Sequence, residues 1–221
     1  MTLALLFLLA ASGPKLDITD ARDKKPSGIN VEASAPDNEG WMDLKVTGKP
    51  KMQPVLVWPF DGKAKLPDGP GGITVIVIER GDQKALASPR VVAALLAAEL
   101  LGKPVDAGLK VTPDALLKTD DYFAKGVGLL YTGKAAEAAD PLSRALRERE
   151  RVLTRIPSDI YPAAMLAGRA LLAAEKYNEA AVAFLKALNH RPSDDAALRA
   201  RAEALTLAGK AEAAKQLLQK P

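Results

Sequence analysis

The pattern of hydrophobic and polar residues changes character before the middle of the chain. Up to residue 87, short β-branched runs alternate with turns rich in Gly, Pro and Asp, which is typical of strands. Apolar residues alternate from Trp41 to Val46, with Leu44 out of phase, and the run from Ile73 is apolar on both faces, which favours a central strand. The predicted strands lie at residues 16–19, 29–33, 41–47, 54–58 and 73–79. Together they predict a small β-sandwich-like domain over residues 14–87.

From residue 88 onward, apolar residues recur at helical spacing. Ser88 followed by Pro89 is an N-cap with proline in the first helical turn. The Ala- and Leu-rich helix that follows is expected to end at Gly102, and a second, short helix is expected after Thr112-Pro113. Residues 88–118 therefore form a helical connector to the rest of the chain.

An internal repeat defines the last part of the sequence. Residues 176–188 align with residues 134–146 and, 34 residues further on, with residues 210–218. A 34-residue period is that of the tetratricopeptide repeat, a helix–turn–helix unit. Residues 119–221 resemble this family. The resemblance implies three units, at 119–160, 161–194 and 195–221.

The central unit carries the residues on which this resemblance depends. Gly168 stands where the first helix approaches its neighbour, Tyr177 opens the second helix, and Phe184 fills the core between units. Small residues at the helix crossings and a proline at the end of the unit complete the set: Ala180, Ala187 and Pro192. The resemblance implies an α-helical solenoid in which each unit packs against the next.

The first unit departs from the pattern in two ways. Pro141 falls inside its second helix, where proline removes a hydrogen bond, so we expect a kink with Asp140 capping the restarted helix. Eight extra residues also separate this unit from the next, and apolar residues keep helical spacing up to Ile156. The second helix of the first unit is therefore expected to be about two turns longer than its counterparts.

The N-terminal strands carry a second set of matching residues: Thr19-Asp20, Lys25-Pro26, Gly28, Val31, Asp61-Gly62-Lys63, Gly72-Ile73-Thr74-Val75 and Gly81. With these residues, the segment 15–87 resembles the carboxypeptidase-regulatory-like, transthyretin-type β-sandwiches of exported bacterial proteins. The resemblance implies a spacer or adhesive module. The expected fold class is α+β in two parts, a small β-sandwich-like domain followed by a tetratricopeptide solenoid.

An uninterrupted apolar run occupies residues 3–11. It is too short to span a bilayer but has the length of a signal-peptide core, and Ala10-Ala11-Ser12 offers small residues for cleavage. We expect residues 1–13 to be a signal peptide, the protein to be exported to the periplasm or cell envelope, and no stable membrane insertion after cleavage. The alternative is a buried N-terminal helix or a misplaced start in a cytoplasmic protein.

Composition narrows the possible chemistry. The 221 residues include no Cys and one His, which removes cysteine nucleophiles, thiolate metal sites and multi-histidine sites. A net charge of +4 is far below that of a nucleic-acid binder. His190 lacks a nucleophile motif, and the pairs Asp120-Asp121 and Asp194-Asp195 are explained by helix capping. We therefore expect no enzyme activity, no cofactor, no metal and no nucleic-acid partner.

The tetratricopeptide resemblance also implies a binding surface. In that family the first helix of each unit lines a concave groove that holds a partner peptide or helix. Carried over by position, the groove residues are Phe123, Val127, Tyr131, Met165, Arg169, Arg199 and Glu203. The alternative is that the units pack on the β-domain and the groove is occupied internally.

A second candidate surface is a basic ridge on the second helix of the first unit, formed by Arg144, Arg147, Arg151 and Arg155. It would suit an acidic partner or anionic head groups, or it is a solvated face with Arg144–Glu148-type pairs. The predicted function is a non-enzymatic scaffold or adaptor that binds a protein or peptide partner. The alternative is an accessory or regulatory subunit of an enzyme whose catalytic chain lies elsewhere.

Overall fold

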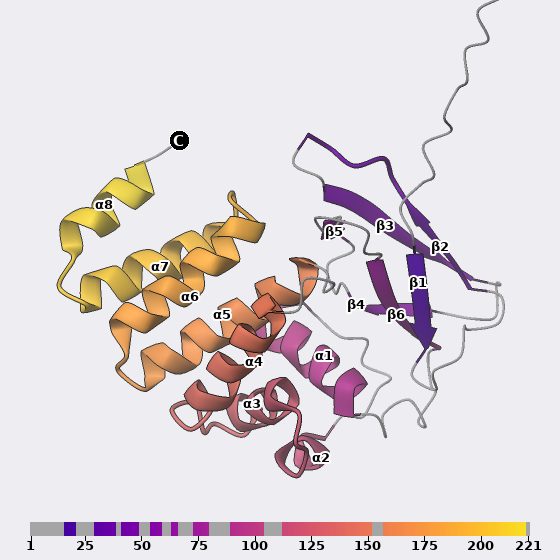
Figure 1. Ribbon diagram of the computed structural model, residues 1–221, viewed down its shortest axis with the longest axis horizontal. Helices are drawn as coiled ribbons and strands as arrows, with labels where there is room; N and C mark the ends of the chain where they lie inside the picture. The colour runs from indigo at the N-terminus through magenta and orange to yellow at the C-terminus, as the bar shows by residue number, and fades with distance from the viewer. Residues whose placement is uncertain are drawn as a thin grey trace, which may run out of the picture.

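The computed structural model describes residues 16–20, 29–38, 41–48, 54–58, 63–65, 73–79, 89–103, 112–151 and 157–219. The described strands are β1 (Leu16–Asp20), β2 (Asn30–Ala33), β3 (Trp41–Thr47), β4 (Pro54–Trp58), β5 (Lys63–Lys65) and β6 (Ile73–Glu79). The described helices are α1 (Pro89–Leu100), α2 (Asp114–Leu117), α3 (Tyr122–Tyr131), α4 (Ala139–Arg151), α5 (Pro157–Ala173), α6 (Tyr177–His190), α7 (Asp195–Leu207) and α8 (Ala211–Gln219). Strands precede helices, as predicted (Figure 1).

The strands form two three-stranded sheets. One has the order β1-β6-β4, with β1 parallel and β4 antiparallel to β6, and the other has the antiparallel order β2-β3-β5. β6 is the central strand of its sheet, as its apolar pattern predicted. The short strand β5 was not predicted, because three residues are too few to show an alternating pattern.

The buried face of β3 differs from the predicted one. Met42 and Leu44 are 1% and 8% exposed, whereas Trp41 is half-buried. Leu44 is therefore in phase with the buried face, and the alternation runs through Met42 and Leu44 rather than from Trp41 to Val46. The two buried residues are two positions apart, as the strand period requires.

The turns between paired helices show that the helical part is a repeat. Gly133, Glu175 and Gly209 all have positive φ, at 79°, 59° and 77°. At each turn the next residue is a lysine whose backbone N–H donates to a carbonyl five residues earlier, at 2.8–2.9 Å. This double-bonded helix end is a Schellman motif. It recurs at the spacing of the aligned lysines Lys134, Lys176 and Lys210.

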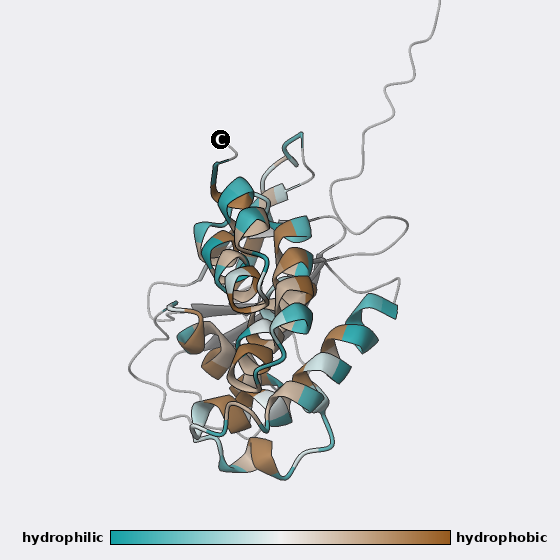
Figure 2. Ribbon diagram, turned by 90° about the vertical axis from the view of Figure 1, so that its left-hand side faces the viewer, coloured by the Kyte–Doolittle hydropathy of each residue, from teal (hydrophilic) through white to brown (hydrophobic). Residues whose placement is uncertain are grey.

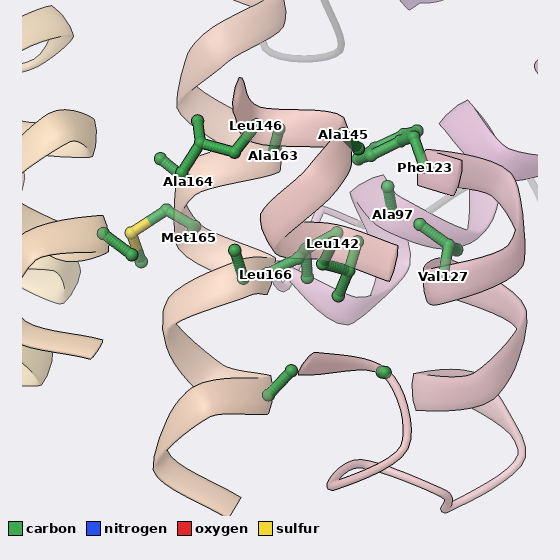
Figure 3. Packing of buried hydrophobic residues seen from close by; sticks show 14 of the residues in the cluster. Ala97, Phe123, Val127, Leu142, Ala145, Leu146, Ala163, Ala164, Met165 and Leu166 are labelled. Atoms are coloured by element: carbon green, nitrogen blue, oxygen red, sulfur yellow. The ribbon is translucent and has the colours of Figure 1, made fainter. Parts of the chain in front are cut away.

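Small residues bring the two helices of a unit together. A Cβ on Gly168 would lie 2.5 Å from Cε1 of Phe184, and Gly126 stands in the same relation to Leu142 of α4. Phe184 and Leu142 are fully buried. Figure 3 shows Leu142 between Val127 of α3 and Leu166 of α5, so it fills the space between the first and second units. The close approach predicted at Gly168 is confirmed, and Phe184 is a core residue that packs against Gly168 within its own unit.

Helix α4 has no kink at Pro141. The helix begins at Ala139, so Pro141 lies in the first turn, where its missing N–H would have no helical partner in any case. The predicted kink and restart are therefore wrong: residues 135–138 form a turn, and the helix starts later than the periodicity suggested. The predicted extension to Ile156 falls on residues 152–156, outside the described part of the chain.

Helix α1 lies between the strands and the helical array (Figure 1). It contacts α3 and α5 on one side and β4 on the other. Eight consecutive residues, from Val91 to Ala98, are buried, which is the signature of a helix surrounded by protein. Figure 2, which views the array from its α8 end, shows hydrophobic residues gathered where the helices pack. In the described segments, no helix has both the length and the apolar character needed to cross a membrane.

Candidate partner-binding surfaces

Three of the residues predicted to line the concave groove belong to the hydrophobic core. Phe123 is 6% exposed, and Val127 and Met165 are 0% and 1% exposed. The guanidinium of Arg149 lies over the Phe123 ring, 3.8 Å from its centre, and so covers this ring at the edge of the core. These three side chains therefore form no part of an open surface. Phe123 and Val127 lie on α3, which packs against α1, whereas Met165 lies on the side of α5 that points away from α3 (Figure 3).

Tyr131 and Arg169 lie on the neighbouring first helices α3 and α5, and both contact the end of α1. The Tyr131 hydroxyl donates to the Glu99 carboxylate at 3.3 Å, and Arg169 donates to the carbonyl of Leu100. Partial burial, then the charge of Glu99 and this hydrogen bond, raise the pKa of Tyr131 above 10. The two residues converge on one place, and α1 of the same chain occupies it.

The α7 part of the predicted groove is exposed. Arg199 and Glu203 both lie on the surface of α7, and Arg199 approaches Asp195 at 3.9 Å within the same helix. An exposed pair of this kind contributes little to stability. Helix α1 thus packs on the concave side of the first unit and reaches the second at Arg169, as in the internal occupation considered as the alternative, while Tyr131 stays 39% exposed and Arg169 is exposed. Among the described residues of the third unit, Arg199 and Glu203 leave this side open.

A cluster around Arg191 joins the strands to the second unit. Its guanidinium lies 3.9 Å from the ring centre of Tyr161 in α5 and 5.8 Å from that of Trp41 in β3. The Tyr161 hydroxyl donates to Asp194 at 2.6 Å, and Asp194 also caps α7 by accepting from Ala197 N–H at 2.8 Å. The predicted capping role of Asp194 is confirmed. The cluster holds the β-rich part against the array.

An accessible groove lies on the other side of the array, between the second helices α4 and α6. Its volume is about 330 Å³. The lining residues are Ser143, Leu146, Arg147, Leu171, Asn178, Glu179, Val182, Ala183 and Lys186. Leu146, Leu171 and Ala183 are buried at its floor, whereas Val182 at the rim is 53% exposed. We call this site the α4/α6 groove. Sequence reasoning did not identify it.

The groove has charged walls. Lys186 Nζ lies 2.7 Å from Glu150 Oε2, an ion pair that ties α6 to α4. Arg147 is exposed and makes no ion pair among the described residues. Since long side chains cover apolar surface with their stems while the charge stays in water, Arg147 and Lys186 can border an apolar floor.

The predicted basic ridge is only partly available to a partner. Arg144 pairs with Asp140 at 3.0 Å and its guanidinium lies 5.5 Å from the Tyr122 ring centre, so the expected Arg144–Glu148 pair is replaced by one a turn earlier. Arg151 is exposed at the end of α4, and Arg155 lies outside the described residues. The ridge that remains along the groove consists of Arg147 and Arg151.

A sequence signal for the α4/α6 groove exists in the repeat alignment. Val182 and Leu185 are 53% and 37% exposed on α6. The aligned positions are Asp140 and Ser143 in the first unit, and Gln216 and Gln219 in the third. The middle unit therefore carries apolar residues at surface positions where its neighbours carry polar ones.

The described residues contain no group of three His, Asp or Glu side chains that could hold a metal ion. His190 is the last residue of α6, where a cation is favoured by the helix dipole, as expected from the sequence. A smaller recess of about 180 Å³ near Asp121 is lined mostly by polar residues, and Asp121 caps α3 by accepting from Ala124 N–H at 2.8 Å. The capping role predicted for Asp121 is confirmed.

No protein-family model matches this chain, and a comparison with curated proteins finds no match either. The chain is similar to a solved structure of a MamA mutant at 19% identity, with a TM-score of 0.42 and coverage of 62% of this chain and 83% of that chain. The three equivalent turns and the paired small residues define the helical part as a repeat of helix pairs.

Proposed function

We propose that this chain is a non-catalytic adaptor that binds a protein partner through its helical repeats. The observation that carries the proposal is the α4/α6 groove, which combines a buried apolar floor with a polar rim, as protein-binding sites do. On the concave side of the same units, α1 packs against α3 and α5, whereas the groove is not covered by another described element. The partner site therefore lies on the side of the second helices.

We further propose that the two sheets stack as a small β-sandwich, which serves as a spacer. Contact between β3 and β4, which belong to different sheets, supports this arrangement.

Export to the cell envelope is proposed from the apolar run at residues 3–11. Intact-mass analysis of the protein purified from its source tests export: a mature chain beginning near residues 12–15 supports it, and a cytoplasmic chain beginning at Met1 contradicts it.

Affinity capture from native cells, followed by mass spectrometry, tests the adaptor role. Wild-type bait is compared with Val182→Asp, which places a charge over the apolar floor, and with Arg199→Glu as a matched surface control on α7. We expect a partner that is lost with Val182→Asp and kept with Arg199→Glu. If only Arg199→Glu lost the partner, the binding site would lie on the concave side of the third unit and not in the groove. A stoichiometric enzyme partner would favour the accessory subunit, and no partner at all would contradict the adaptor role.

A further inference from the structure

We propose that the α4/α6 groove binds an amphipathic helix of the partner, and that this helix carries carboxylates on the flank that lies along α4. The inference rests on the proposed adaptor function and specifies the chemistry of its partner. Three features of the groove lead to it: its length, its fixed walls and its uneven charge.

The length of the groove suits a short helix. The lining residues run along α6 from Asn178 to Lys186, which is about 12 Å at the helical rise per residue. Over that length a bound helix presents apolar side chains at positions i, i+3 or i+4, and i+7. The floor of Leu146, Leu171 and Ala183 offers them apolar contact, and Val182 extends that contact to the rim.

The walls of the groove are set before a partner arrives. Lys186 pairs with Glu150 across the two helices at 2.7 Å, with both side chains about one-third exposed. At the start of α6, Lys210 donates to the lining residue Asn178 at 2.7 Å and ties the first turn of α6 to the third unit. A preformed site costs less ordering of side chains on binding, which favours its use as a recognition surface.

The charge along the groove is uneven. The charge of Lys186 is balanced by Glu150, whereas Arg147 and, one turn later, Arg151 are exposed on α4 without an ion pair among the described residues. The α6 side carries Glu179 instead. Carboxylates of a bound helix are therefore favoured on the α4 side, and like charges there would be repelled. Such rim pairs select the partner and its orientation more than they add affinity.

A display library of helical peptides tests this inference with the full chain as bait. The library fixes Leu at an i, i+4, i+7 stripe and randomises the flanking positions, and each selected peptide is counter-screened against Val182→Asp. We expect Val182-dependent peptides that are enriched in Asp and Glu on one flank. When Arg147→Glu replaces the wild-type chain as bait, the selected peptides should carry Lys and Arg on that flank instead. Peptides from the wild-type selection should bind Arg147→Glu about two- to fivefold more weakly, the range for an exposed ion pair.

The possible results separate this inference from the adaptor proposal. Val182-dependent peptides with neutral or basic flanks would overturn the carboxylate assignment, and an absence of Val182-dependent peptides would overturn the helix-in-groove assignment. A Val182-dependent dimer in sedimentation analysis would overturn it by assigning the groove to a second copy of the chain. Arg199→Glu, the matched control on α7, should leave peptide binding unchanged. If Val182→Asp still captured the cellular partner, the partner would not bind in the α4/α6 groove, but the adaptor function would stand.

Discussion

The two sides of the first and second helical units differ in how their apolar surface is used. On the side of α3 and α5, the helix α1 of the same chain packs against the apolar surface, and the exposed side chains of Tyr131 and Arg169 both bond to its end. On the side of α4 and α6, a groove with a buried apolar floor is left uncovered and Val182 stands exposed at its rim. The same helix pairs therefore present one closed and one open face.

This difference shows that a repeat fold does not by itself locate the binding surface. A solenoid leaves both faces available in principle, and the segment that precedes it decides which face remains. Here the preceding segment is a helix with eight consecutive buried residues, and it makes the concave side part of the hydrophobic core. The groove on the opposite side is left for a partner.

The largest expected effect comes from the core that both faces share. Phe184→Ala should lower the free energy of unfolding by about 3–5 kcal/mol, because a fully buried Phe against Gly168 leaves a cavity. Val182→Ala, on the same helix but 53% exposed, should change it by less than about 0.5 kcal/mol. Urea unfolding measures both. Equal effects of the two substitutions would contradict the placement of the core.

The next prediction concerns the packing of α1 against α3 and α5. Leu96 of α1 is 1% exposed, so Leu96→Ala should cost about 2–5 kcal/mol and should destabilise α3 and α5 together with α1. Arg90→Ala at the exposed start of α1 is the control and should have little effect. Hydrogen exchange resolves the helices separately. If exchange increased in α1 while α3 and α5 stayed protected, α1 would be a displaceable ligand, and the concave side would be available to partners.

The contact between strands and array predicts a smaller effect. Arg191→Met keeps the apolar stem but removes the guanidinium that lies over Tyr161 and near Trp41. The loss should be about 0.5–2 kcal/mol, the range for cation–π contacts from exposed to desolvated sites. Thermal unfolding measures it, with Arg199→Met on the α7 surface as control. An unchanged melting temperature would show that this cluster does not hold the two parts together.

Tyr131 predicts a pH dependence of the closed face. Its pKa is raised in the folded chain, so the folded state keeps the phenol proton to higher pH than the unfolded state does. The stability that this proton confers is present below about pH 10 and is lost as the pH rises past that value. Wild type should therefore lose more stability than Tyr131→Phe between pH 9 and pH 11, taken as roughly one unit either side of the ordinary tyrosine value. Identical pH profiles would contradict the Tyr131–Glu99 contact.

The fold was largely predictable because its signals are local. The repeat follows from the recurring Lys134, Lys176 and Lys210, and the structure gives each of them the same turn. The kink predicted at Pro141 was wrong because the sequence did not show that α4 begins at Ala139. Proline is unfavourable within a helix but is tolerated in its first turn. The short strand β5 carried no usable period.

The binding surface was predicted less well because it depends on long-range packing. The apolar residues of α1 show that the helix is buried, but not that it lies against α3 and α5. Phe123, Val127 and Met165 occupy the expected helix positions and are nevertheless core residues. The α4/α6 groove is lined by residues more than thirty positions apart, such as Leu146 and Ala183, so the hydrophobic pattern of one helix does not reveal it, and its sequence signal appears only when the repeats are aligned.

The measurement that tests the central claim most directly is a thiol footprint of the complex. The chain has no Cys, so Val182→Cys and Arg199→Cys each place a single reactive thiol, one in the α4/α6 groove and one on the open concave surface of α7. Maleimide labelling rates are compared with and without the captured partner. We predict that the partner slows labelling at position 182 by about tenfold or more, because a bound side chain excludes water from the groove, and leaves position 199 unchanged. Protection at position 199 with free labelling at position 182 would contradict the account.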